Sequence, residues 1–272
     1  MKQNRSFHLV CSALVFACLL GDPVDIQADT TLVTFTETGS HTFKVKGQKV
    51  LILQSGESAL PQSILYDRPR REMTLLDHQK KTFLLIEATK LEKLGTKVHD
   101  VLDEVDERLS LLGGEAEQEA LRGLLRGVLS ELGKDGGKHS EKAFVMRDRT
   151  SRISRWDCKV LDRKADGKRD ATFYLVDRKT LGISKSDHKT LVSLESFTND
   201  LLSALPAGES IRQAIGPPDL YFPEGQIPVR TITYAEQEKI TSQLGEVSLD
   251  ELDQREFAIP EGYTEEKIDL PF

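Results

Sequence analysis

Residues 71–86 read REMTLLDHQKKTFLLI, two apolar runs on either side of a polar turn. Short runs of this kind around a turn such as Asp77-His78-Gln79-Lys80 predict an antiparallel hairpin. The preceding segment follows the same pattern. Residues 31–38 alternate along TLVTFTET, residues 41–45 alternate again, and residues 50–53 and 63–66 are further short apolar runs separated by turn residues. We therefore expect an antiparallel meander over residues 29–87.

The period changes after residue 90. Apolar residues recur at spacings of three and four along one stripe, which predicts a long amphipathic helix. Gly113-Gly114 ends it, and a second stripe follows over residues 115–132. The two together predict a helical hairpin over residues 90–132, which packs on the sheet within one chain or pairs two chains as a short coiled coil. The first stripe contains Leu91, Leu94, Val98, Val101, Val105, Leu109 and Leu112, and the second contains Leu121, Leu124, Leu125, Val128 and Leu132.

Strand patterns return after the polar linker 133–140. They cover residues 154–162 and 170–176, and a second hairpin is predicted over 226–234 and 239–247. Between them, Ser186 is a candidate N-cap for a helix over residues 187–205. Strands, helices, strands, helix and strands in this order predict an α+β fold rather than a doubly wound parallel sheet. We expect one domain over residues 29–265 and a tail over 266–272.

The N-terminus has the features of an export signal. Lys2 and Arg5 precede an uncharged segment over residues 7–20, which is short for a membrane span. Cleavage after Ala28 would release a chain into the periplasm or the medium. Two alternatives stay open: an uncleaved anchor, and lipidation at Cys18, against which the neighbouring Phe16 counts.

Composition excludes several protein classes. The chain has 37 Lys and Arg against 44 Asp and Glu, a net charge of −7, and 6% aromatic residues. These values exclude a collagen, a disulfide-rich scaffold and a polytopic membrane protein. Residues 134–189 carry 16 basic and 9 acidic residues. Few aromatic residues lie among them, so we expect no nucleic-acid partner.

Motifs for catalysis and metal binding are missing from the sequence. It contains no G-x-S-x-G, H-E-x-x-H, P-loop or G-x-G-x-x-G pattern, and the histidines are scattered singly. We therefore expect no enzyme activity, catalytic residue, metal or cofactor. A hydrolase whose residues meet only in space is the least supported alternative. Cys158 is the one cysteine after the signal segment and is interpreted as a buried strand residue.

The order of these segments resembles that of a known group of exported bacterial proteins. The features are the stretch SILYDRPRREMTLLDHQKKTF at 63–83, Trp156-Asp157-Cys158, Leu181-Gly182-Ile183, Ile227-Pro228-Val229-Arg230, and the ending FAIPEGY at 257–263. They are similar to domain-of-unknown-function family 4412, within the LolA-like and LppX-like lipoprotein-carrier half-barrels. The resemblance implies a curled antiparallel sheet of about eleven strands, with helices on its concave side and no enzyme activity.

The leading functional hypothesis is that the sheet and helices enclose a lipid, an acyl chain or another apolar ligand, with peripheral membrane contact or none. The sequence does not fix the strand register, so either face of the sheet can be the inner one. The alternative is a protein–protein interaction module of the cell envelope that uses the acidic segment 246–272 or the helical hairpin. The residues expected to line the apolar cavity are Leu75, Phe83, Leu85, Phe173, Leu175, Leu194, Phe197 and Leu201.

Overall fold

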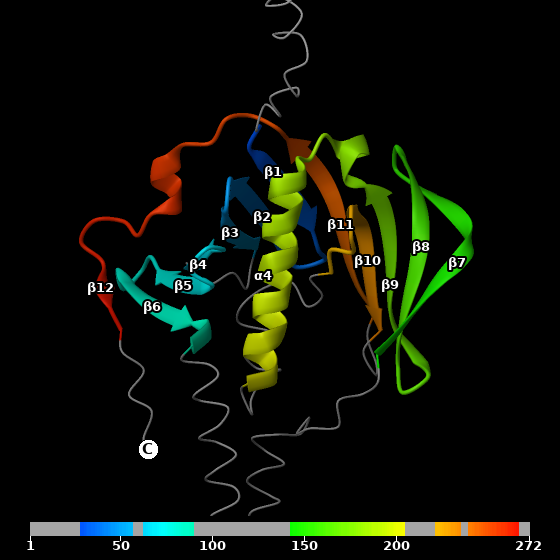
Figure 1. Cartoon of the computed structure of the whole chain (residues 1–272), viewed down its shortest axis with the longest axis horizontal. Coiled ribbons are helices and arrows are strands. Elements are labelled where there is room, and N and C mark those ends of the chain that lie inside the picture. Colours follow the sequence, from blue (N-terminus) through cyan, green and yellow to red (C-terminus); the bar gives the residue numbers. More distant parts are fainter. Residues whose placement is uncertain (1–27, 57–61, 90–141, 205–220, 235–238, 267–272) are drawn as a thin grey trace, which may run out of the picture.

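The computed structural model describes residues 28–56, 62–89, 142–204, 221–234 and 239–266. These residues form one large curved sheet and one long helix, α4, which stands against the sheet (Figure 1). The fold is therefore α+β with the sheet dominant. The predicted helical hairpin at 90–132, the linker 133–140 and nearly all of the predicted signal segment 1–28 lie outside the described residues.

The sheet has twelve strands in the order β12-β6-β5-β4-β3-β2-β1-β11-β10-β9-β8-β7. All neighbouring strands are antiparallel except β12 and β6, which are parallel. The strands are β1 Thr30–Phe35, β2 Gly39–Lys46, β3 Lys49–Gly56, β4 Gln62–Asp67, β5 Glu72–Asp77, β6 Thr82–Glu87, β7 Lys142–Ile153, β8 Trp156–Ala165, β9 Lys168–Asp177, β10 Gln226–Tyr234, β11 Lys239–Ser248 and β12 Thr264–Glu265.

The hairpins predicted from alternation are present. The opening stretch forms β5 and β6, with Met73 paired to Ile86 and Asp77 paired to Thr82. Strands β10 and β11 form the second predicted hairpin. The central join is between β1 and β11, where Thr31 pairs with Ser248. Both halves of the chain therefore belong to one continuous sheet.

Helix α4 (Lys185–Ala204) begins two residues earlier than the sequence suggested. The hydroxyl of Ser184 accepts a hydrogen bond from the backbone N–H of Asp187 at 3.0 Å, so Ser184 is the N-cap and the prediction of Ser186 was wrong. A short 3-10 helix, η1 (Arg178–Leu181), leads into α4. The apolar residues Leu191, Leu194, Phe197 and Leu201 recur along α4 at helical spacing and are at most 1% exposed.

Buried side chains from much of the sheet surround α4 in what we call the inner cluster. Strands β1 to β5 contribute to it, as do β7 to β11, so α4 forms part of the protein core. Sheet residues in this cluster are Leu32, Phe43, Val45, Val50, Ile52, Ile64, Tyr66, Met73, Ile153, Trp156, Cys158, Val176, Ile227, Val229 and Leu244.

The opposite face of β3 to β6 is also covered. Residues 249–266, here called the strap, contain the 3-10 helix η2 (Gln254–Phe257) and end in β12. Phe257, 2% exposed, packs with Leu51, Leu65 and Leu76 in the strap cluster. The strap is tied down near its start, where the carboxylate of Asp29 accepts from the backbone N–H of Leu252 at 2.8 Å. Strands β3 to β5 are therefore buried on both faces.

Strand β7 was not expected from the sequence, which placed the next strand only at residue 154. It has twelve residues, pairs only with β8 within the described chain, and is mostly exposed. Phe144, Val145 and Met146 are 43%, 44% and 47% exposed. An edge strand that buries little needs no regular apolar alternation, which explains why the pattern was missed. None of the described helices has the length and apolar content needed to cross a membrane.

Candidate ligand site

Four of the eight residues expected at an apolar site lie together around α4. Leu194, Phe197 and Leu201 belong to the inner cluster, and Leu75 packs against it from β5. The ring centroids of Phe197 and Tyr66 lie 5.5 Å apart and tilted, which is a favourable aromatic geometry. The Tyr66 hydroxyl donates to the backbone carbonyl of Ser193 at 3.1 Å, so the polar end of this buried ring has a partner.

The other four predicted residues do not join this group. On β6, Phe83 packs into the strap cluster, and Leu85, which is partly buried, lies two residues further along the same face. Phe173 and Leu175 lie in a third cluster with Leu161, Ala171 and the partly buried Tyr221. Register explains the division on β6. Leu75 pairs with Leu84, whereas Phe83 pairs with Leu76, so Phe83 lies on the face opposite Leu75.

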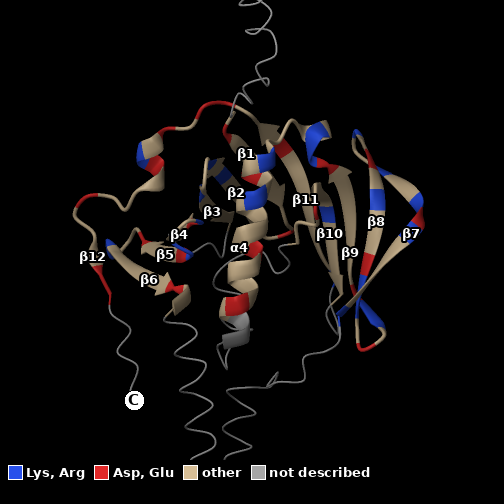
Figure 2. Ribbon diagram, in the orientation of Figure 1, with Lys and Arg blue, Asp and Glu red and all other residues tan. Residues whose placement is uncertain are grey.

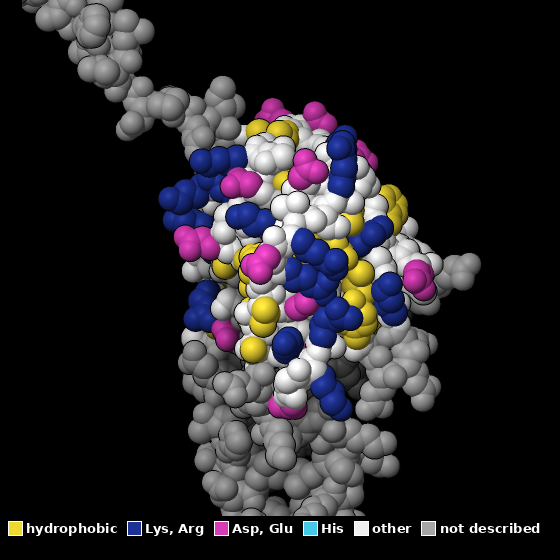
Figure 3. Space-filling view, turned by 90° about the vertical axis from the view of Figure 1, so that its right-hand side faces the viewer, with side chains coloured by type: hydrophobic (Ala, Val, Ile, Leu, Met, Phe, Trp, Pro, Cys, Tyr) yellow, Lys and Arg dark blue, Asp and Glu magenta, His cyan; other side chains and the backbone are white. Residues whose placement is uncertain are grey.

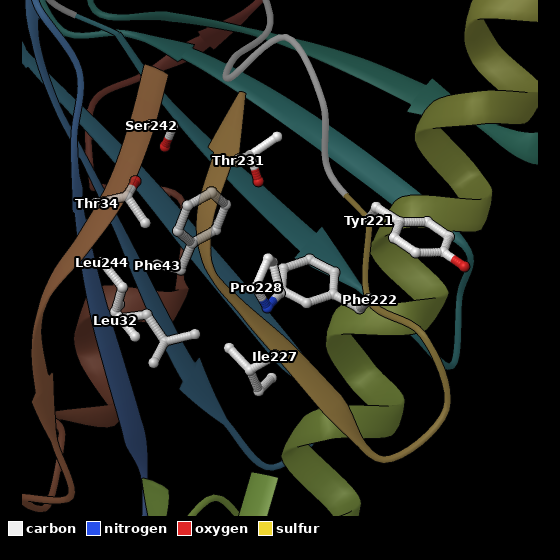
Figure 4. Close-up of a pocket in the computed structure, with 10 residues that line it drawn as sticks. All are labelled: Leu32, Thr34, Phe43, Tyr221, Phe222, Ile227, Pro228, Thr231, Ser242 and Leu244. Atoms are coloured by element: carbon white, nitrogen blue, oxygen red, sulfur yellow. The ribbon is translucent and has the colours of Figure 1, made fainter. Parts of the chain in front are cut away.

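A small apolar cavity lies between the sheet and the segment 221–223 (Figure 4). Its volume is about 40 Å³. A water needs roughly 10–15 Å³ by a similar measure, and a dry cavity of about 150 Å³ holds benzene. The cavity as it stands is therefore too small for an acyl chain. Its lining, from β1, β2, β10, β11 and the segment 221–223, is Leu32, Thr34, Phe43, Tyr221, Phe222, Ile227, Pro228, Thr231, Ser242 and Leu244.

Phe222 closes one side of this cavity from a segment without regular secondary structure. Figure 4 shows its ring turned toward Pro228 and Ile227. The backbone N–H of Phe222 donates to Oε2 of Glu195 on α4 at 2.6 Å. Sequence reasoning missed Phe222 and Glu195 because neither belongs to a recognisable motif.

His188 and Tyr221 hold the same segment in place. Nε2 of His188 lies 3.1 Å from the carbonyl oxygens of both Pro223 and Gln226, so this nitrogen carries the proton and donates to them. The ring of Tyr221 lies between two other rings, with centroids 4.7 Å from Phe144 and 4.8 Å from Phe173. One wall of the cavity is thus formed by strands, and the other is formed by the segment 221–223, which hydrogen bonds to α4 hold in place.

Comparisons with known proteins add little at this point. No protein-family model matches the sequence, and no curated protein matches it. Among solved structures, PNGF-II is similar in two crystal forms, C2 and P21, with TM-scores of 0.38 and 0.39 at 9% and 8% sequence identity. The matches cover 89% and 88% of this chain. The chain spans about a third of the length of those structures, 31% in each case.

Burial of Glu195 raises the pKa of its carboxyl above the ordinary value of 4.5, although the hydrogen bond from Phe222 acts in the opposite direction. Between the unfolded and folded pKa values the native state binds more protons than the unfolded state. The contribution of this group to stability is therefore present below the unfolded pKa and is lost as the pH rises through the folded pKa.

We expect Glu195→Gln to remove this component of the pH dependence, because the glutamine stays neutral while its carbonyl can still accept from Phe222. The measurement is urea unfolding of both proteins between about pH 4 and about pH 8. Glu224→Gln, at an exposed residue beside the same segment, is the matched control and should keep the wild-type slope. Equal slopes for wild type and Glu195→Gln would contradict the prediction.

A serine, a histidine and a tyrosine meet at the strap. Nε2 of His78 lies 2.8 Å from the Ser63 hydroxyl, and Nδ1 lies 2.8 Å from the Tyr263 hydroxyl. This geometry resembles a nucleophile and base, but the third group is a phenol rather than the carboxylate that stabilises an imidazolium. Ser63 is 2% exposed, and none of the three residues lines the apolar cavity. We interpret the three groups as a lock that fixes the strap to β4 and the β5–β6 turn.

Cys158 is fully buried in the inner cluster, and burial raises the pKa of its thiol. A raised pKa lowers the fraction of reactive thiolate, as expected for a structural cysteine. Within the described ranges, no group of three or more His, Cys, Asp or Glu side chains is arranged to hold a metal ion.

Proposed function

We propose that this protein is an exported, non-enzymatic binding protein of the LolA-like half-barrel type, which takes a lipid, an acyl chain or another apolar ligand between its sheet and α4. The observation that carries the proposal is the apolar cavity beneath Phe222. It lies at the centre of the sheet, on the side that α4 occupies. Ligand sites in proteins are mostly apolar and concave, with few polar groups.

Binding an acyl chain requires the cavity to grow. Strands β1, β2, β10 and β11 form the wall that is fixed by backbone pairing. The opposite wall depends on the ring of Phe222 and on the Glu195 and His188 hydrogen bonds. Outward movement of Phe222 would enlarge the cavity on the side where Tyr221 also lines it. In this proposal Phe222 is the group that a ligand displaces.

The test is native mass spectrometry of the full chain produced in a secreting host. The mass is measured before and after the protein is extracted with organic solvent. The expected result is excess mass that disappears on extraction and identifies the ligand class. A bare chain mass in both samples, with no uptake of an apolar fluorescent probe by the extracted protein, would overturn it.

A second candidate function is a protein–protein interaction module, and strand β7 favours it. The edge carries three exposed apolar residues, together with Lys142, Arg149 and Arg152 against Asp148, whereas Arg147 is paired with Asp162 of β8 (Figure 3). An extended, acidic segment of an envelope protein would complement this edge by strand addition. Val145→Pro removes a backbone donor on β7, and loss of a co-purifying partner in this variant is the expected result. Retention of every partner would exclude this version.

The acidic segment 246–272 is a poor candidate for such an interface as a whole. Residues 246–248 belong to β11, Phe257 is buried, and β12 pairs with β6. Its deletion would remove part of the fold along with any binding surface. The last residues, 267–272, lie outside the described part of the chain.

A further inference from the structure

A polar cleft of about 830 Å³ opens where three chain turns meet at the N-terminal end of α4. The β2–β3 turn, the β4–β5 turn and the first turn of α4 form its walls, and Figure 2 shows lysines (blue) in this part of α4. This volume suits a small-molecule ligand. Its lining residues are Asp29, Lys46, Gly47, Gln48, Lys49, Asp67, Arg68, Pro69, Lys185, Ser186, Lys189 and Gln254.

The charge of this cleft is strongly unbalanced, because five basic side chains line it against two carboxylates. The two carboxylates are already engaged. Asp29 lies 2.6 Å from Nζ of Lys46, and Asp67 lies 3.8 Å from Nζ of Lys49. Among the described residues, Arg68, Lys185 and Lys189 form no ion pair with a carboxylate. Within the described part of the chain, these three cations therefore face the cleft without a carboxylate ion-pair partner.

Lys185 and Lys189 also oppose the local electrostatics of the helix. They lie four residues apart, so like charges are adjacent on one face of α4. Both lie near the N-terminal end, where the helix dipole favours anions and disfavours lysine. The Ser184 hydroxyl caps the N–H of Asp187, whereas the N–H groups of Lys185 and Ser186 precede the first intrahelical acceptor. An anion in the cleft would meet both the lysines and this end of the helix.

The walls of the cleft are held in place by hydrogen bonds. The hydroxyl of Thr190, a fully buried residue on α4, donates to the carbonyl of Gly47 at 3.0 Å. The backbone N–H of Arg68 donates to the carbonyl of Gln48 at 3.0 Å and joins the two turns. Gly47 has φ +60°, a conformation that glycine adopts without strain. The cations are thus presented on a framework that is already ordered before any ligand arrives.

We propose that this cleft binds a ligand through a phosphate group. Phosphate carries up to two negative charges, and its oxygens match both the forked donors of Arg68 and a helix N-terminus. A free phosphate monoester and an anionic phospholipid headgroup share this chemistry. The site uses none of the residues of the apolar cavity, so the failure of either proposal leaves the other intact.

The test measures binding of glycerol 3-phosphate to the full chain by isothermal titration calorimetry, and binding of phosphatidylglycerol vesicles by co-sedimentation, with phosphatidylcholine vesicles as a blank. The variant Lys185→Gln with Lys189→Gln should weaken binding about tenfold or more, since two charge-assisted contacts are lost. Lys168→Gln with Lys179→Gln removes the same net charge at exposed residues outside the cleft and should leave affinity almost unchanged. Arg68→Gln tests the cleft from a different element.

Loss of glycerol 3-phosphate binding in the cleft variants alone would support a free phosphate ester as ligand. Loss of vesicle binding in those variants alone would support a lipid headgroup. Equally weakened binding in both double variants would mean that binding depends on overall charge, and would overturn the proposal. Failure of the wild-type chain to bind either probe would also overturn it. The Lys185→Gln and Lys189→Gln changes should leave the protein folded. Removing lysines that oppose the helix dipole should not lower the thermal midpoint of unfolding.

Discussion

Replacing Phe197 by alanine (Phe197→Ala) should lower the free energy of unfolding by about 3–5 kcal/mol. Phe197 is 1% exposed and lies in the inner cluster, where α4 meets the sheet. Its loss would remove the ring contact with Tyr66 and leave a cavity that strand pairing prevents from collapsing. Equilibrium denaturation in urea, followed by circular dichroism, measures the change in midpoint and slope.

Phe35→Ala is the matched control. Phe35 is 52% exposed on β1 and lies over Gly245 of the neighbouring strand. Deleting its ring should cost less than about 1 kcal/mol, as is usual for a cross-strand contact. If the two variants lost stability equally, α4 would not be a core element and the inner cluster would have to be reinterpreted.

Replacing Phe222 by alanine (Phe222→Ala) should convert the small cavity into one that binds benzene without any displacement of the segment 221–223. The ring is 6% exposed and forms one wall of the cavity. Its removal should enlarge the space toward the roughly 150 Å³ that accommodates benzene, and should destabilise the protein by about 3 kcal/mol. Calorimetric titration with benzene measures the new site, and the thermal midpoint with and without benzene gives an independent reading.

The wild-type chain and Phe35→Ala should show no benzene-dependent rise in the midpoint. A rise in the wild type equal to that in Phe222→Ala would mean that Phe222 does not close the cavity. Absence of binding in Phe222→Ala, with the variant still folded, would mean that the loop collapses into the vacated space.

The sequence was sufficient to predict most of the hairpins and the helix next to η1, because each depends on local spacing. The sequence did not predict which of the strand residues lie on the same face of the sheet. Leu75-Leu76 and Phe83-Leu84-Leu85 are uninterrupted apolar runs. Without alternating polar residues, such runs do not show which side chains point to which face of the sheet. The structure gives the reason: Leu75 contacts the inner cluster and Leu76 the strap cluster, since both faces of these strands are covered. The strap that covers the second face is too irregular to be recognised from period alone.

The basic cleft could not be predicted because its residues come from three distant segments. Lys46 and Lys49 flank one turn, Arg68 lies on another, and Lys185 and Lys189 open a helix. One local signal was present: two lysines follow the serine cap on either side of Asp187, near a helix end where the dipole disfavours basic residues. The error of two residues in the cap position hid it, because a helix that begins at 187 leaves Lys185 outside.

The pairing of β1 with β11 and of β12 with β6 has a consequence for the timing of folding. Thr31 pairs with Ser248, and Thr82 pairs with Thr264. The middle of the sheet and the free edge of β6 are therefore completed only by segments that lie far along the chain from β1 and β6 and that are synthesised later. Contacts of such long sequence separation form slowly. Until residue 264 has been synthesised, the edge of β6 lacks β12 as its partner, so a chaperone that shields residues 82–87 should matter most before that point.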